Sequence, residues 1–335
     1  MSAQIGLSGE PPGIWPDLAR RAKEKINQYE YIPSLDDEKL VPCMIALLDY
    51  LPEGGRESIA RDILGCESNK KKLYDVFQNI RSCLLFAMKA AGHSSINRTP
   101  IDDDRKDNVE PIISELNYPQ HRERQFRDKV LYRDRFRCVV TKDMDFNHWE
   151  KVGEPAGIMY SELEAAHIIP LPLASWKESP TASFDASNVW EMLYRCFPKV
   201  RQIGMKVDNI NNPCNGISLR DSLQTQFRKF HLAFAPTAIP NTYKVKTYLA
   251  FPTYLRRDIP YDGFICFTDS SNAHDVPLPD AALFDCHYRV AEVLNASGML
   301  GEIDTKIEEW EDMEVNMWDD HLAEDGTTDI SAQSP

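Results

Sequence analysis

The sequence predicts an α+β fold, in which a helical N-terminal region precedes a segment of short strands mixed with helices. Apolar residues recur at helical spacing through residues 12–92, whereas short apolar runs between turn signals alternate with helical patterns in residues 109–279. Hydrophobic residues make up 42% of the 335, which is enough for a packed core and excludes a largely disordered chain.

The first region, residues 1–92, is expected to be helical. Its longest predicted helix runs from Lys70 to Ala91 and stops before Gly92, a residue type that commonly caps helix C-termini. The apolar positions Leu73, Val76, Phe77, Ile80, Cys83, Leu84 and Met88 lie on one stripe of it. A polar segment without apolar periodicity follows at residues 93–108, and we interpret it as a linker.

Residues 109–300 are expected to form the α+β domain, with short strands at 232–234 and 243–251 that extend its sheet and a final helix at about 280–296. The remaining residues, 301–335, hold twelve acidic residues and one lysine and predict a mostly disordered tail. The alternative is a short helix that docks on a protein partner or back onto the basic region, through Trp310, Met313, Met317 and Trp318.

Several classes of protein are excluded by what the sequence lacks. No stretch of about 18 apolar residues predicts a membrane span, and the N-terminus lacks the pattern of a secretory signal. The eight cysteines form no C-x-x-C pair, so we expect free thiols in the cytoplasm or nucleus. Because the acidic tail carries most of the net charge of −14, that charge does not exclude nucleic acid as a partner. The oligomeric state is not determined.

Three segments of the middle region carry the chemistry. They are Arg133-Asp134-Arg135-Phe136-Arg137-Cys138-Val139-Val140-Thr141-Lys142, then Leu163-Glu164-Ala165-Ala166-His167-Ile168-Ile169-Pro170, then Asn215-Gly216-Ile217-Ser218-Leu219-Arg220-Asp221-Ser222-Leu223-Gln224-Thr225-Gln226-Phe227. Their order and form resemble the HNH nuclease family, in the variant common in fungal proteins. The resemblance covers about half of the chain. It implies a ββα-metal core, made of an antiparallel hairpin and a helix that together hold one divalent ion.

The resemblance implies a role for each matching position. His167 takes the place of the general base, and Asn215 that of the asparagine that fixes the hairpin. Gln224 stands where the family has a histidine on the helix, and Arg228 where it usually has aspartate. The residue before the base is Ala166, as in many proteins of the fungal variant. The cofactor implied for an active protein is Mg²⁺ or Mn²⁺, and otherwise none.

The departures weaken the implied metal site. A glutamine carbonyl can bind magnesium, but it is neutral and weaker than a carboxylate. Asp221 lies three residues before Gln224 on the same helix face, so it is a candidate second ligand; its alternative role is to cap the helix. Glu162 and Glu164 are other nearby acids.

The histidines have alternative interpretations. His167 between apolar residues is either a base or a satisfied core histidine, and its flanking motif favours descent from a base. His148 and His231 are either stand-in ligands or residues with packing and surface roles, and the second interpretation is favoured. His287, on the last helix, is expected to be structural.

The stretch from Arg122 to Lys142 contains eight basic residues against three acidic ones, with apolar residues interleaved. One interpretation is a phosphate-binding face that leads into the hairpin; the other is a solvated amphipathic helix held by ion pairs. The candidate nucleic-acid-binding residues are Arg124, Arg127, Arg133, Arg135 and Arg137.

Three functional hypotheses follow. The first is an HNH-type endonuclease-like protein for metal-dependent phosphodiester hydrolysis of DNA, with that activity weakened or lost through Gln224 and Arg228. The second is a non-catalytic binding module that keeps the HNH scaffold for its shape. The third is an accessory protein or repurposed enzyme in fungal small-molecule metabolism. No Walker loop, dinucleotide fingerprint or G-x-S-x-G elbow indicates another enzyme class.

Overall fold

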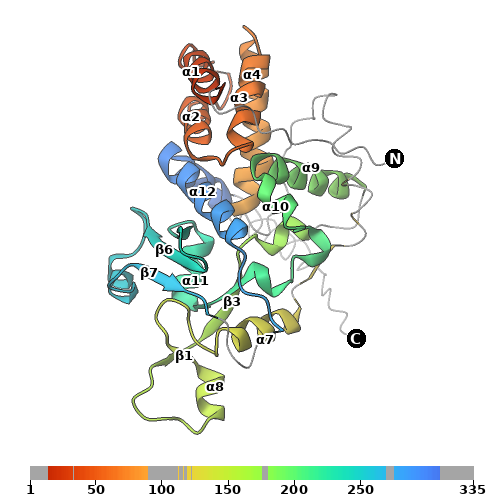
Figure 1. Cartoon of the computed structure of the whole chain (residues 1–335). Helices are drawn as coiled ribbons and strands as arrows, with labels where there is room; N and C mark the ends of the chain where they lie inside the picture. Colours follow the sequence, from red (N-terminus) through yellow and green to blue (C-terminus); the bar gives the residue numbers. More distant parts are fainter. Residues whose placement is uncertain are drawn as a thin grey trace, which may run out of the picture.

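The structure is a computed structural model that describes residues 14–32, 34–89, 112, 116, 119–121, 123–175, 180–268 and 275–309. The linker expected at residues 93–108 and the residues Trp310, Met313, Met317 and Trp318 of the tail lie outside this set. Figure 1 shows the N-terminal helices at one end of the molecule, α9, α10 and α12 in the middle, and α7 and α8 at the opposite end.

The N-terminal region is helical, as the sequence predicts. Its elements are α1 (Ile14–Asn27), α2 (Leu40–Tyr50), α3 (Gly55–Gly65), α4 (Lys70–Ile80), a π-helix (Arg81–Phe86) and α5 (Ala87–Lys89). The Asn69 side chain caps α4 by accepting a hydrogen bond of 3.1 Å from the backbone N–H of Lys72. The helix expected over residues 70–91 is thus interrupted by a π-helical segment.

The mixed region contains short strands and helices. They are α7 (Arg124–Arg133), β1 (Met144–Asp145), α8 (Phe146–Lys151), β2 (Tyr160–Ser161), β3 (Leu163–His167), α9 (Pro180–Cys196), α10 (Pro198–Gln202), β4 (Gly216–Arg220), α11 (Asp221–Arg228), β5 (Leu232–Pro236), β6 (Thr242–Thr247), β7 (Phe264–Cys266) and α12 (Ala281–Ser297). Short 3₁₀ turns cover Leu171–Ala174, Val207–Asn209, Pro213–Asn215 and Thr253–Asp258.

The strands form three small sheets. β1 and β2 pair in parallel, β3 and β4 form an antiparallel hairpin, and β5, β6 and β7 form an antiparallel sheet in that order. The strands predicted at residues 232–251 therefore exist, but they do not extend the hairpin sheet as expected. They belong to a sheet of their own, whose strand β5 packs on α12.

One hydrophobic core joins the two regions. Buried apolar side chains from Ala22 in α1 to Ile303 near the C-terminus belong to a single cluster. Helix α2 packs on α12, and both α3 and the π-helix pack on α9 (Figure 1). The boundary predicted at residue 92 thus separates two regions of sequence, and not two cores.

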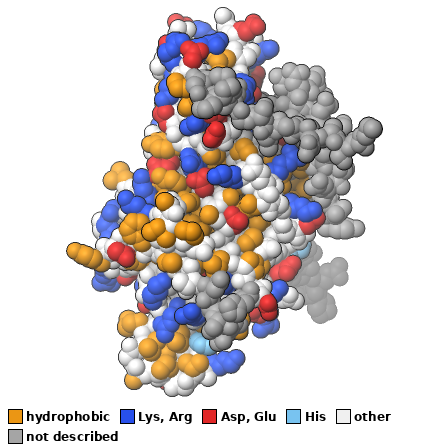
Figure 2. All heavy atoms as spheres, viewed as in Figure 1, with side chains coloured by type: hydrophobic (Ala, Val, Ile, Leu, Met, Phe, Trp, Pro, Cys, Tyr) orange, Lys and Arg blue, Asp and Glu red, His pale blue; other side chains and the backbone are white. Residues whose placement is uncertain are grey.

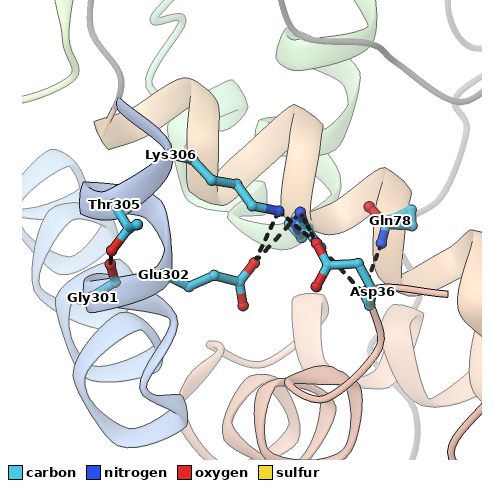
Figure 3. Close-up of polar contacts among 7 residues, drawn as sticks. Asp36, Gln78, Gly301, Glu302, Thr305 and Lys306 are labelled. Atoms are coloured by element: carbon cyan, nitrogen blue, oxygen red, sulfur yellow. Dashed lines mark hydrogen bonds and ion pairs between the residues drawn. The ribbon is translucent and has the colours of Figure 1, made fainter. Parts of the chain in front are cut away.

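The beginning of the acidic tail is ordered against the N-terminal helices. Helix α12 ends before Gly298, whose φ of +71° suits glycine, and residues 299–309 form a further helix. Figure 3 shows Lys306 and Glu302 of this helix beside Asp36; the Lys306–Asp36 ion pair measures 2.5 Å and the Lys306–Glu302 pair 3.6 Å. Arg81 pairs with Glu302 at 3.4 Å. The expectation of disorder from residue 301 is therefore wrong for residues 301–309.

The surface is mixed in character. On the face seen in Figure 2, basic, acidic and apolar side chains are interspersed among the described residues. Within the described part of the chain, no helix combines the length and apolarity needed to cross a bilayer. The eight cysteines, all of them described, form no disulfide.

Candidate active site

The hairpin and helix implied by the resemblance are present and consecutive. β3 and β4 pair in a register that runs from Leu163 opposite Arg220 to His167 opposite Gly216. Helix α11 begins directly after β4 and packs on both strands. The C-terminal end of β3, which carries His167, thus lies beside the strand that leads into α11.

A buried ion pair fastens the first motif to the hairpin. The Arg133 guanidinium pairs with Asp134 at 2.8 Å and donates to the backbone carbonyls of Pro213, Pro277 and Gly216. The Asp134 carboxylate also accepts a 2.9 Å hydrogen bond from the backbone N–H of Ser218 in β4. A buried charge requires such partners, because water is not available to solvate it. The assignment of Arg133 to a nucleic-acid surface is wrong, since only 3% of this residue is exposed.

Helix α7 packs against the same end of the hairpin because Gly216 has no side chain. A Cβ at Gly216 would lie 2.6 Å from atoms of both Phe126 and Val130 on α7. The Phe126 ring also stacks on His167, with ring centroids 3.9 Å apart and an interplanar angle of 11°. This stacking fixes the orientation of the His167 ring.

Asn215 joins the segment after β3 to the turn before β4. The residue is fully buried. Its Oδ1 accepts a 2.8 Å hydrogen bond from the backbone N–H of Ile169, and its Nδ2 donates to the carbonyls of Ile169 and Ile210 at 3.0 Å each. The geometry matches the hairpin-fixing role expected for this position.

The Nε2 of His167 is engaged by Asn211, a residue that no motif of the sequence indicates. It lies 3.0 Å from Oδ1 of Asn211, whose Nδ2 donates to the carbonyl of His121 at 2.8 Å. Because that carbonyl can only accept, the amide of Asn211 must present its oxygen to His167. Nε2 is therefore the donor, and the lone pair of the neutral ring lies on Nδ1.

His167 and α11 line one pocket, which we call the α11 pocket. Its volume is about 250 Å³. The lining residues are Met88, Ala165, Ala166, His167, Ile168, Pro170, Leu171, Pro172, Gln224, Phe227, Arg228, Phe230 and His287. The hairpin, α11, α12 and the N-terminal helical region all contribute, so the last of these supplies one wall of the site through Met88.

The residues of this pocket do not fit a divalent metal. Mg²⁺ and Mn²⁺ favour oxygen ligands, chiefly carboxylates, whereas the side chains in the lining that have polar atoms are two imidazoles, one neutral amide and the Arg228 guanidinium. Arg228 adds a permanent positive charge to this lining. Nowhere in the described ranges do three or more His, Cys, Asp or Glu side chains gather in a metal-binding group.

The other candidate ligands lie away from the α11 pocket. Asp221 is exposed in the first turn of α11, where its charge favours the helix dipole, but its side chain makes no capping hydrogen bond. Glu162 and Glu164 do not line the pocket either. His148 stacks on Phe136, and His231 hydrogen-bonds Gln226 at 2.9 Å. Neither histidine lines the pocket, and these contacts agree with the packing and surface roles favoured for them.

His287 has a structural role and also borders the pocket. Its ring lies between Phe227 and Phe230, with centroid distances of 3.8 and 4.5 Å, and its Nε2 donates to the carbonyl of Phe227 at 3.1 Å. Burial lowers the pKa of His287 to about 3, because the charged ring would lose its hydration. The ring is thus neutral near pH 7, with Nδ1 as an acceptor.

The predicted basic residues are divided between surface and interior. Arg124 and Arg135 are exposed. Arg127 donates to the carbonyl of Leu163 at 3.0 Å and thereby ties α7 to β3, and Arg137 donates to the carbonyl of Lys142 at 2.8 Å. Arg127 and the buried Arg133 therefore hold the first motif to the hairpin, whereas Arg124 and Arg135 remain exposed.

Three contributors to the site were missed by sequence reasoning. Asn211 holds His167, Phe126 stacks on it, and Met88 comes from the N-terminal region. Phe126 had a signal in the apolar stripe that accompanies the basic stretch. Met88 lay on the apolar stripe of the helix predicted over residues 70–91, but nothing indicated that it reaches the site. Asn211 had no signal, because it lies in no motif and its approach to His167 depends on the fold.

Comparison with known families agrees with this geometry. Residues 138–235 match the family model described as HNH endonuclease. The match begins at Cys138 of the first motif, includes β3, β4 and α11, and ends in β5. This segment is therefore an HNH endonuclease domain, flanked by α7 and α12 and by the N-terminal helices. No curated protein and no solved structure matches the chain.

Proposed function

We propose that the HNH domain binds DNA and that its metal-dependent hydrolysis of phosphodiesters is weakened or lost. The observation that carries this proposal is the pair Gln224 and Arg228, which α11 contributes to the pocket beside His167. Like charges repel, so the fixed cation of Arg228 opposes a divalent ion, and a neutral glutamine does not offset that repulsion. The same cation attracts a phosphate.

The described lining of the pocket supports the loss of hydrolysis. A general base must offer a lone pair to the attacking water. Because Nε2 of His167 donates to Asn211, the lone pair of the neutral ring lies on Nδ1, so this hydrogen bond does not itself remove the base. The described lining residues, however, offer no carboxylate to hold a metal ion and its bound water.

DNA is proposed as the partner on two grounds. An HNH endonuclease domain indicates a nucleic-acid partner, and the exposed side chains of Arg124 and Arg135 lie on and just after α7, the helix that covers the hairpin. Each phosphate neutralised by a basic side chain releases counterions and steepens the salt dependence of binding.

A plasmid assay tests the catalytic part of the proposal. We expect the wild-type protein to leave supercoiled plasmid intact in Mg²⁺ or Mn²⁺. The double variant Gln224→His/Arg228→Asp, which restores the family's residues, should gain nicking, and the addition of His167→Ala should remove it again. Nicking by the wild-type protein that depends on metal and on His167 would show instead that hydrolysis is retained.

A binding assay tests the DNA part. In EDTA, fluorescence anisotropy should show that the protein binds duplex or single-stranded DNA, and that the affinity falls as salt rises. The double variant Arg124→Gln/Arg135→Gln should bind more weakly, with a salt slope shallower by about one for each phosphate that the protein no longer neutralises. The matched control is Lys72→Gln, which removes an exposed charge from the N-terminal region. No DNA binding at low salt, or equal effects of the two changes, would reject the proposal.

Retained hydrolysis is the second candidate. It is favoured by the intact hairpin, in which Asn215 holds the segment after β3 and His167 still lines the pocket. The plasmid assay separates the two candidates, because only retained hydrolysis predicts nicking by the wild-type protein.

A further inference from the structure

The sheet of β5, β6 and β7 buries one face and exposes the other. On the buried face, the Tyr243 ring of β6 packs on Phe284 of α12, with ring centroids 4.3 Å apart. The next residue, Lys244, is exposed and lies directly opposite the exposed Phe264 of β7 in the strand register. Successive side chains of a strand point to opposite faces, so Lys244 and Phe264 are neighbours on the exposed face. Figure 1 shows β6 and β7 at one side of the molecule.

The chain before β7 adds four more exposed cationic and aromatic side chains. The 3₁₀ turn Thr253–Asp258 is followed by a tight turn, in which the N–H of Gly263 donates to the carbonyl of Pro260 at 2.8 Å. The carbonyl of Gly263 in turn accepts a 2.8 Å hydrogen bond from the N–H of Val245, so the turn lies beside β6. We define the β7 surface as the exposed side chains of Lys244, Tyr254, Arg256, Arg257, Tyr261 and Phe264.

The three cations of the β7 surface have no acidic partner in the described chain. Within the described ranges, no hydrogen bond or ion pair engages the side chains of Lys244, Arg256 and Arg257. The whole chain is acidic, with a net charge of −14, so most of its cations could find a carboxylate. A local group of unpaired cations attracts an anionic partner whatever the net charge of the chain.

The two acids of this segment are already engaged. Asp258 forms an ion pair with Arg220 at the end of β4, and Asp262 accepts a 3.0 Å hydrogen bond from the backbone N–H of Phe264. Arg220 also pairs with Asp143 at 3.4 Å. Since Arg220 lies within the matched residues 138–235, its bond to Asp258 fastens the β7 surface beside the HNH domain, although the surface itself lies outside the match.

Three aromatic side chains project from the same surface. Tyr254, Tyr261 and Phe264 are 64%, 110% and 42% exposed, and none of them contacts another ring within the described chain. Single exposed apolar residues are ordinary, but three aromatic rings in this short segment, beside unpaired cations, indicate a binding surface. Aromatic rings between cations are the means by which proteins bind single-stranded nucleic acids, since bases stack on the rings and phosphates lie at the cations.

We propose that the β7 surface binds single-stranded DNA, as a second contact outside the segment that matches the HNH endonuclease family. The inference rests on the proposed function, which supplies DNA as the partner, and adds the place of contact and the kind of strand. The three aromatic side chains stack on bases, and the three cations neutralise phosphates. Only a single strand offers the faces of its bases, because neighbouring base pairs cover them in a duplex.

Fluorescence anisotropy in EDTA tests the stacking. The probes are a short oligothymidylate, an abasic oligomer of the same length and charge, and a duplex of that length. Tyr254→Ala/Tyr261→Ala should weaken binding of the oligothymidylate at least about fivefold, the low end for loss of stacking on one base. The same variant should change the affinity for the abasic oligomer and the duplex by less than about twofold. An unchanged affinity for oligothymidylate, or equal losses on all three probes, would overturn the proposal.

Two control variants keep this test specific. Tyr254→Phe/Tyr261→Phe retains the rings and should bind oligothymidylate within about twofold of the wild type, because stacking does not need the hydroxyl. Tyr31→Ala removes a ring that is 53% exposed in the N-terminal region, and should also have an effect below about twofold. Melting curves of all variants establish that they are folded. A loss in the phenylalanine variant as large as that in the alanine variant would exclude stacking.

A pair of charge variants tests the cations. Arg256→Gln/Arg257→Gln should weaken binding of both the oligothymidylate and the abasic oligomer, and should make the salt dependence shallower by about 0.7 for each phosphate no longer neutralised. Lys72→Gln/Lys199→Gln removes two exposed charges, on α4 and α10, and should leave the salt slope unchanged. Equal changes of slope in the two variants would overturn the assignment of phosphate contacts to the β7 surface.

The outcomes distinguish this inference from the proposed function. DNA binding that depends on Arg124 and Arg135, but not on the β7 surface, would overturn the inference and leave the proposed function standing. Oligothymidylate binding that depends on the β7 surface alone would support the inference and remove the contact proposed at α7. Vesicles of phosphatidylserine and phosphatidylcholine serve as the alternative anionic partner. Vesicle binding that the β7-surface variants weaken, without loss on oligothymidylate, would overturn the choice of DNA.

Discussion

Asn215→Ala removes three buried hydrogen bonds at once. The substitution leaves the N–H of Ile169 and the carbonyls of Ile169 and Ile210 without their partner. A buried polar group left unsatisfied costs about 1–3 kcal/mol, so the variant should lose roughly 3–5 kcal/mol of the free energy of unfolding. That is a large fraction of the roughly 5–15 kcal/mol typical of globular proteins.

Urea unfolding followed by tryptophan fluorescence measures this loss. The control is Asn209→Ala, since Asn209 also hydrogen-bonds backbone groups, at Lys206 and Gly204, but in an exposed turn. Water replaces those partners, so we expect a loss of about 1 kcal/mol or less. Asn215→Asp should be at least as harmful as Ala, because a carboxylate would face two carbonyl oxygens. Equal, small losses in all three variants would refute the reasoning.

Three further predictions concern the packing around the site. Arg133→Met should cost about 3–5 kcal/mol in the same assay, because it leaves the buried Asp134 carboxylate without its cation, and a loss under about 1 kcal/mol would contradict this. Gly216→Ala should lower the free energy of unfolding by about 1–3 kcal/mol, since its Cβ would lie 2.6 Å from Phe126. An unchanged melting temperature in thermal unfolding would contradict this, because α7 would then shift without cost. The pKa of His287 is lowered in the folded state to about 3, so the unfolded chain binds the additional proton between about pH 6.5 and 3. Its contribution to stability is therefore complete above about pH 6.5 and is lost as pH falls, and urea unfolding of His287→Phe should show a shallower acid dependence than the wild type.

The N-terminal helices show what the local spacing of apolar residues can predict and what it cannot. Apolar spacing predicted helices where α1 to α5 lie, because the period of an amphipathic stripe is visible in the sequence whatever the stripe packs against. The same pattern could not show that α2 packs on α12 or that Met88 enters the site. Those contacts join segments that are remote in the sequence, and no local signal encodes them.

Arg133 shows that residue type alone does not predict the direction of a side chain. A basic residue beside a nuclease-like motif suggested phosphate contact, since a residue type reports charge but not direction. In the fold, the guanidinium points inward to Asp134 and to three backbone carbonyls. Residues 301–309 of the acidic tail illustrate the same limit, because the ion pairs from Glu302 and Lys306 to the N-terminal region order a segment whose composition alone predicted disorder.

The sequence by itself determined the chemistry available to this protein: a hairpin and helix with His167, Asn215, Gln224 and Arg228 in a fixed order. Motif order and residue type are local properties, so they could be read directly. Only the tertiary structure decided what these residues face. It placed Asn211 against His167, left the buried Nδ1 of His287 without a partner in the described chain, and brought Arg228 to a pocket without a carboxylate in its described lining. Burial and distance between remote segments set those properties, and they depend on how the whole core packs.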